Sequence, residues 1–144
     1  MILIDTTVLV YAAGDPHPLA APARRLLVAV ASGRIRATTT VEVIQEFAHI
    51  RARRRSRGDA VERARELAAG LSPLISTDER DLSRGLQIFG ETRLGAFDAV
   101  LAGVAIERRL EGLVSADAAF GDVRELRWLS LDDPEVTRLS EGIG

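Results

Sequence analysis

The sequence contains no cysteine. This absence excludes disulfide frameworks, cysteine-ligated zinc sites and thiol nucleophiles, so any bound metal must be held by oxygen or histidine ligands. The sequence also lacks a stretch of about 18 apolar residues, the length that indicates a membrane span. Its apolar beginning is interrupted by Asp5 and has no basic leader. We therefore expect a soluble, cytoplasmic protein with no membrane anchor.

Lysine is absent as well, so arginine supplies all 19 basic residues, against 21 acidic residues and a formal net charge of -2. Because the charges nearly balance, the net charge alone does not point to any class of binding partner. The arginines are unevenly placed, however, because five of them crowd into residues 51–57, whereas the acidic residues are spread along the chain. The sequence thus combines a local basic patch with a mildly acidic body.

Length and composition favour one globular domain over residues 1–144, because 47% of the residues are apolar and 28% are charged. A chain of this size buries a hydrophobic core without a metal or disulfide to hold it. We expect residues 132–144 to form a surface tail.

Short apolar segments alternate with amphipathic ones along the chain. The pattern predicts strands at 2–4, 34–38, 113–115 and 128–131. It predicts one helix that begins near Thr6 or Thr7, which are suitable N-caps, and further helices at 19–32, 41–53, 59–69, 78–90 and 96–110. Asp59 is the expected cap of the helix at 59–69, and Gly70 is its expected stop. This alternation is typical of a single α/β domain with a mostly parallel sheet.

Two acidic residues follow predicted strands. Asp5 ends the first strand, and Asp117 lies two residues beyond the strand that ends at Ser115. The crevice outside the carboxyl ends of parallel strands is the usual ligand site in such a sheet, and the two carboxylates converge there if their strands are neighbours. The alternative is that each acid caps a helix or a turn.

Two further acids lie on predicted helices. Asp98 shares a helical face with Leu101 and other apolar residues, so its carboxylate needs a partner, unless free backbone amides of the first helical turn satisfy it. On the helix from 41, Glu46 borders the apolar face, whereas Glu42 points toward water. Glu46 is therefore the better ligand candidate.

Carboxylates that gather without bases repel one another, and a hard divalent cation relieves that repulsion. Oxygen ligands suit Mg²⁺ or Mn²⁺, whereas zinc prefers the histidine or cysteine ligands that this sequence lacks in suitable spacing. Such a metal binds phosphate oxygens and activates water. The arginines that follow Glu46 can hold phosphates beside the acids, although an arginine run can equally be a solvated face. The combination indicates a nuclease.

Four segments carry a resemblance to a known family: IDTTVL at 4–9, EVIQEF at 42–47, GAFDAVLA at 95–102 and LVSADAAF at 113–120. In this order and approximate spacing, spanning residues 1 to about 131, they resemble the PIN-domain ribonucleases, and particularly the VapC toxins of toxin–antitoxin pairs. The resemblance implies a three-layer α/β/α fold with a mostly parallel central sheet. It also implies metal-dependent hydrolysis of RNA phosphodiester bonds that leaves a 5′ phosphate and a 3′ hydroxyl.

The resemblance further implies roles for named residues and partners. The catalytic and metal-binding acids are Asp5, Glu46, Asp98 and Asp117, with Mg²⁺ or Mn²⁺ as the cofactor. The candidates for substrate binding are Thr7, Ser115, Arg51, Arg53, Arg54 and Arg55. Resemblance to VapC implies a cognate VapB-type antitoxin and a homodimer, with RNA as the substrate.

Two other functions compete with this interpretation. A Mg²⁺-dependent phosphatase of the haloacid dehalogenase type also has an aspartate after its first strand, but its second aspartate would fall at Thr7. A non-catalytic RNA-binding or regulatory module could use the arginines while the acids only cap helices. The presence of all four acids favours the nuclease.

Overall fold

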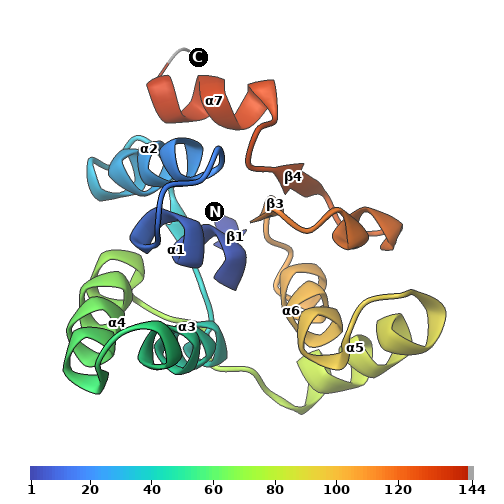
Figure 1. The fold of residues 1–144 in the computed structure, drawn as a ribbon. Helices are drawn as coiled ribbons and strands as arrows, with labels where there is room; N and C mark the ends of the chain where they lie inside the picture. Colours follow the sequence, from blue (N-terminus) through green and yellow to red (C-terminus); the bar gives the residue numbers. More distant parts are fainter. Residues whose placement is uncertain (143–144) are drawn as a thin grey trace.

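A four-stranded parallel sheet forms the centre of the protein in the computed structural model, which describes residues 1–142 (Figure 1). The strands are β1 (Ile2–Ile4), β2 (Ala37–Thr38), β3 (Gly112–Ser115) and β4 (Trp128–Ser130), in the order β2-β1-β3-β4. Every pair in the sheet is parallel. Since Ile4 lies opposite Val114, the residues that follow β1 and β3 meet at one edge of the sheet.

Helices cover both sides of this sheet, as the three-layer fold requires (Figure 1). They are α1 (Thr6–Ala13), α2 (Ala20–Ala31), α3 (Val41–Arg54), α4 (Arg57–Leu71), α5 (Glu79–Glu91), α6 (Ala96–Glu107), α7 (Pro134–Glu141) and the short 3₁₀ helix η1 (Ala118–Asp122). The predicted α/β class and parallel sheet are confirmed.

The sheet forms because its strands are short and continuously apolar, the pattern of strands buried on both faces. Leu3, Ile4, Leu113 and Val114 are fully buried between the helical layers. Helix α6 is also apolar nearly all round, and it is buried from Leu101 to Ala105. The first turn of α6 is thereby fixed beside the carboxyl edge of the sheet.

The helix caps correct several expected boundaries. Asp5, and neither Thr6 nor Thr7, caps α1 by accepting a hydrogen bond from the Thr7 amide. Ser56 caps α4, so Asp59 lies inside the first turn, and Gly70 lies inside the helix that it was expected to end. These differences have one reason: several residues in each segment are suitable caps, and packing against neighbouring helices selects among them.

Two chain segments also differ from expectation. Only Ala37–Thr38 of the predicted strand at 34–38 pairs with β1. Within the expected surface tail at 132–144, Pro134–Glu141 form α7, which Asp133 caps and whose Val136 and Ser140 are buried. Helix α7 packs on α2. Residues 143–144 of that tail lie outside the described residues. No helix within residues 1–142 combines the length and the apolar character needed to cross a membrane.

Candidate active site

Asp5 lies at the centre of the carboxyl edge of the sheet. It directly follows β1, and its backbone amide donates to the Val114 carbonyl at 3.0 Å, which extends the pairing with β3. Its side chain is almost inaccessible, and Oδ2 accepts hydrogen bonds from Ser115 Oγ at 2.6 Å and Thr7 Oγ1 at 2.9 Å. Oδ1 accepts no hydrogen bond from residues 1–142. One carboxylate oxygen is thus held in place while the other stays available to a ligand.

A short polar network joins Asp5 to the end of β3. The Ser115 hydroxyl, which donates to Asp5, accepts from the Asp117 amide at 3.0 Å, and Thr7 Oγ1 accepts from the Ala116 amide at 3.1 Å. Asp117 then caps η1, because its Oδ1 accepts from the Ala119 amide at 2.9 Å. Thr7 and Ser115 therefore orient Asp5 and the chain that carries Asp117.

Asp98 lies in the first turn of α6, after the N-cap Gly95. Its side chain accepts no hydrogen bond from the part of the chain that the structure describes, so the alternative of a carboxylate satisfied by first-turn amides does not hold. Burial raises the pKa of Asp98 to about 7, and the charges of Asp5, Glu46 and Asp117 add to the rise. These effects place Asp98 among the other three acids.

Glu46 reaches the same region from the middle of α3. Burial raises the pKa of Glu46 above its usual range, and the charge of Asp5 raises it further, while the Thr6 hydroxyl and His49 oppose the rise. The Thr6 hydroxyl is itself buried, and it has no partner at hydrogen-bonding distance and geometry among residues 1–142. Glu42 lies elsewhere, where its carboxylate accepts from Thr77 at 2.9 Å.

The acids line one cavity of about 430 Å³. Asp5, Glu46 and Asp98 contribute to its wall, as do Thr7 and Arg54. Ser115 and Asp117 do not line it: Ser115 is buried behind Asp5, and Asp117 acts on Asp98 through its charge. The structure thus brings three of the four predicted acids to a single opening.

The residues of this cavity fit a hard divalent cation by their chemistry. They offer carboxylate oxygens whose mutual repulsion a positive charge relieves, and a buried hydroxyl on Thr6 without a partner within the described chain. No three Asp, Glu or His side chains among residues 1–142 form a complete ligand set for one ion. Mg²⁺ does not require one, since it usually keeps several waters and binds one or two carboxylates.

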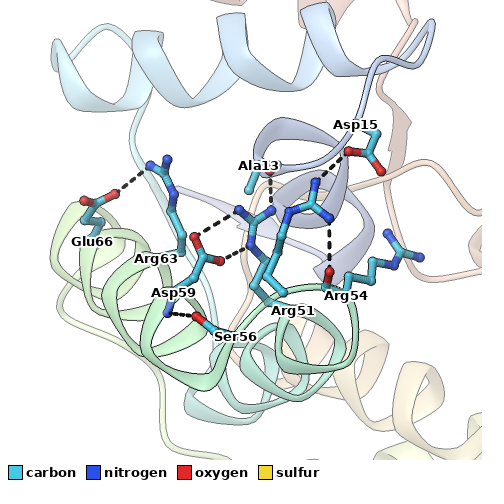
Figure 2. A network of polar contacts seen from close by, with 9 residues as sticks. Ala13, Asp15, Arg51, Arg54, Ser56, Asp59, Arg63 and Glu66 are labelled. Carbon is cyan, nitrogen blue, oxygen red and sulfur yellow. Dashed lines mark hydrogen bonds and ion pairs between the residues drawn. The ribbon is translucent and has the colours of Figure 1, made fainter.

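The basic patch at residues 51–57 is only partly available to a ligand. Arg51 is 12% exposed; its guanidinium pairs with Asp59 at 2.5 Å and donates to the Ala13 carbonyl at 2.6 Å (Figure 2). These contacts do not favour the predicted contact of Arg51 with RNA, because its donors already hold α3, α4 and the end of α1 together. Arg51 therefore has little exposed surface to offer phosphate.

Three other arginines of the patch, Arg53, Arg54 and Arg55, differ in their contacts. Arg55 pairs with Asp15 at 2.7 Å and donates to the Arg54 carbonyl at 3.1 Å. Arg53 and Arg54 are exposed, and Arg54 also lines the acidic cavity. Figure 2 shows the Arg54 guanidinium outside the network of ion pairs. Arg54 is thus the cation of the patch that reaches the site.

The cavity is also lined by residues that were not predicted as functional. Tyr11 and His17 stack with ring centroids 4.4 Å apart, and both line the cavity together with Pro16 and Ile50. The sequence does place His17 in a loop between two prolines. No pattern in the sequence indicates that this loop folds back onto Tyr11, since their contact depends on the path of the chain after α1.

Comparisons with known proteins agree with this geometry. The family model described as "PIN domain" matches residues 2–126. The chain is similar to Ribonuclease VapC7 of Mycobacterium tuberculosis (strain ATCC 25618 / H37Rv), with 52% identity over 128 residues that cover 88% of each chain.

Two solved structures share the fold at low sequence identity. One is VapBC2 from Rickettsia felis, crystallised bound to a DNA fragment from their promoter; the TM-score is 0.73 at 18% identity, covering 90% of this chain and 98% of that one. The other is FitAcB from Neisseria gonorrhoeae, with a TM-score of 0.64, 18% identity and coverage of 91% and 98%. At this identity the likeness concerns the fold alone.

Proposed function

The chain belongs to the PIN-domain family, and from this membership we propose that it is a divalent-metal-dependent ribonuclease and the toxin of a toxin–antitoxin pair. The observation that carries the proposal is the convergence of Asp5, Glu46 and Asp98 on one cavity, with a pKa of about 7 at Asp98. Similarity at 52% identity to a protein named as a VapC ribonuclease supports the same activity.

Asp5, Glu46 and Asp98 would hold Mg²⁺ or Mn²⁺ directly or through water molecules bound to the ion, and Asp117 would add negative charge from beyond the cavity wall. When bound, such an ion activates water and neutralises charge on the phosphate. Thr7 and Ser115 keep Asp5 in one orientation through hydrogen bonds of 2.9 and 2.6 Å. A fixed carboxylate holds its ligand in one geometry, which favours in-line attack.

Exposed arginines beside the cavity would bind the RNA backbone. Arg54 lines the acidic cavity, and Arg53 is exposed next to it in the chain. Arginine binds phosphate through a planar fork of donors, so these side chains can place a phosphodiester next to the carboxylates in spite of their negative charge. Arg55 is available only if its ion pair with Asp15 opens.

The partner of this protein would be a VapB-type antitoxin that covers the site. Solved structures that share the fold include a VapBC complex, and the similar protein at 52% identity is a VapC. A homodimer and a cytoplasmic location also belong to this proposal, as the VapC resemblance implies them.

The two competing functions differ in ways that one experiment resolves. A phosphatase of the haloacid dehalogenase type would need an acid at position 7, where the Thr7 hydroxyl instead donates to Asp5. A non-catalytic module would bind RNA with or without metal and leave it intact.

The test is cleavage of a total RNA pool with the product ends mapped. We expect the full chain to cut RNA only with Mg²⁺ or Mn²⁺, and to leave 5′ phosphates and 3′ hydroxyls. Asp98→Asn should lower the rate at least about 100-fold, since single groups that position or stabilise the reacting charge contribute about 10²–10³. Glu107→Gln, at the other end of α6, is the matched control. Cleavage that persists in EDTA, or in Asp98→Asn, would contradict the proposal.

A further inference from the structure

The stacked pair Tyr11 and His17 gives the acidic cavity a second, chemically different wall. The imidazole and phenol rings lie 4.4 Å apart at an interplanar angle of 26°. Tyr11 is half-buried, whereas His17 is exposed, so one face of the imidazole rests on Tyr11 and the other is open. Val10 and Pro16 extend this apolar wall. Charged carboxylates and phosphates gain little from contact with such a surface, whereas a flat, uncharged ring can stack on it.

Three arginines contact the end of α1 and the loop that follows it, which carries His17. Arg51 donates to the Ala13 carbonyl at 2.6 Å, and Arg55 pairs with Asp15 at 2.7 Å (Figure 2). From the other side, Arg24 donates to the carbonyls of Ala12 at 2.9 Å and Gly14 at 3.4 Å.

His17 itself is oriented within this loop. Its Nδ1 accepts a hydrogen bond from the Leu19 amide at 3.1 Å, and it is flanked by Pro16 and Pro18. The prolines reduce the conformational freedom of the backbone, so little ordering remains to be done when a ligand binds. With Nδ1 as acceptor, the neutral ring carries its proton on Nε2, a donor that is not used by residues 1–142.

From this arrangement we infer that Tyr11 and His17 form a nucleobase-binding platform, on which one base of a single-stranded RNA stacks while its neighbouring phosphate lies between Arg54 and the carboxylates. The platform rests on the proposed function for the identity of the ligand. Its chemistry is that of single-strand binding sites, in which bases stack on aromatic faces next to a cationic groove. The open face of His17 takes the base, and Tyr11 supports the imidazole from behind.

The position of the platform assigns it a role in choosing the cleavage site. It shares the cavity with Asp5 and Asp98, so a stacked base and the reacting phosphate belong to the same short stretch of RNA. Stacking accepts every base, so the platform favours an unpaired base beside the reacting phosphate without preferring one base over another.

The test compares two single-stranded RNA hexanucleotides labelled with fluorescein, one intact and one with abasic internal nucleotides. Binding is measured by fluorescence anisotropy in EDTA, so that cleavage does not enter. The wild-type chain should bind the intact RNA about 5- to 150-fold more tightly than the abasic RNA, the range that one stacked base contributes. His17→Ala and Tyr11→Leu should lose most of this ratio and keep their affinity for the abasic RNA.

Two further variants serve as controls. Tyr11→Phe preserves the ring and should keep the ratio, and Phe89→Leu removes an exposed aromatic side chain that does not line the cavity and should also keep it. Thermal melting checks that each variant is folded. If Tyr11→Leu does not fold, the binding ratio of His17→Ala, which changes an exposed residue, tests the platform by itself. A wild-type ratio near one, or an unchanged ratio in His17→Ala, would overturn the platform.

The outcomes separate this inference from the proposed function. Base-dependent binding that His17→Ala abolishes supports the platform even if no cleavage occurs with Mg²⁺ or Mn²⁺. Metal-dependent cleavage together with base-independent binding supports the ribonuclease and overturns the platform.

Discussion

At the scale of single residues, burial and charge conflict most at Asp98. Its carboxylate is partly buried, faces three other acids and accepts no hydrogen bond within the described part of the chain. Together these effects raise the pKa of Asp98 to about 7. A group with a raised pKa binds its proton more tightly in the folded than in the unfolded state. The folded state is therefore favoured by Asp98 below its unfolded pKa of about 4, and this contribution is lost as the pH rises to about 7.

Replacement of Asp98 should therefore change how stability depends on pH. Without divalent metal, we expect Asp98→Asn to melt at a higher temperature than the wild type at pH 8, and the difference to shrink below pH 5. A difference of about 1 kcal/mol corresponds to roughly 3 °C for a chain of this size. Thermal melting in EDTA at several pH values measures it, with Glu62→Gln, which changes an exposed acid outside the cavity, as the control. Equal pH profiles for Asp98→Asn and wild type would contradict the electrostatic account.

At the scale of elements, the corner between α3 and α4 shows how a basic patch can be structural. Arg51 joins three elements: it lies on α3, pairs with Asp59 of α4 and donates to the Ala13 carbonyl at the end of α1. Replacing Arg51 by alanine removes the hydrogen-bond donor of both the Ala13 carbonyl and Asp59. Because Arg51 is mostly buried, water does not fully take its place. Arg53, two residues on, is exposed.

Arg51→Ala should therefore lower the free energy of unfolding by about 1–3 kcal/mol, the cost of leaving partly buried polar groups unpaired. Arg53→Ala should change it by less than about 0.5 kcal/mol, as is usual for surface positions. Urea denaturation of the two variants provides the measurement. If Arg53→Ala were the more destabilising change, the assignment of Arg51 as the structural arginine would be wrong.

The contact between α5 and α6 depends on two glycines. A Cβ on Gly85 would lie 2.5 Å from the Val100 Cα, and a Cβ on Gly103 would lie 2.8 Å from the Asp81 carbonyl oxygen. The backbones of the two helices therefore approach too closely for any side chain at these positions. Since α6 carries Asp98, this contact also sets the position of one wall of the site.

Gly85→Ala should destabilise the protein by about 1–3 kcal/mol, because the new methyl group overpacks against backbone that cannot move locally. Gly90 on the same helix has no atom near its would-be Cβ. Gly90→Ala should instead stabilise the helix by about 0.5–1 kcal/mol through its higher helix propensity. Denaturation curves of Gly85→Ala and Gly90→Ala distinguish the effect of close packing from that of helix propensity. A stabilising Gly85→Ala would refute the close contact between α5 and α6.

At the scale of the whole molecule, four acidic residues from separate parts of the chain gather at one edge of the sheet. Asp5 follows β1, Asp117 follows β3, and α3 and α6 bring Glu46 and Asp98 to the same place. A ligand that binds only the folded state stabilises that state by mass action. A divalent cation should therefore stabilise the entire fold through this edge.

Mg²⁺ or Mn²⁺ should raise the melting temperature of the wild-type chain in a concentration-dependent way. At a metal concentration about 100 times Kd, the added stability is about 2.7 kcal/mol. Asp98→Asn should show a smaller rise, and Asp122→Asn, which changes an exposed acid outside the cavity, should show the wild-type rise. Thermal melting across millimolar metal gives the comparison; a flat curve for the wild type would contradict a metal site in the cavity.

Helix periodicity and strand pattern were sufficient to predict much of this protein. They predict the buried strand at Ile2–Ile4, the helix that brings Glu46 rather than Glu42 to the cavity, and the carboxyl edge at which Asp5 and Asp117 lie. Glu42, which was expected to face water, is instead half-buried and accepts a hydrogen bond from Thr77. They fail at Ser56, because Ser56 and Asp59 are equally good caps in isolation. The expected surface tail likewise contains α7, whose formation depends on burying Val136 against the rest of the protein.

The sequence by itself determined the local properties: which segments are apolar, where acids follow strands, and the absence of thiol and lysine chemistry. Those properties depend on residue type and spacing, which are complete in the sequence. Only the tertiary structure decided which arginine is buried against Asp59 and which faces the cavity, and that His17 folds back onto Tyr11. Contacts of this kind join residues through the path of the chain in space, so no local pattern contains them.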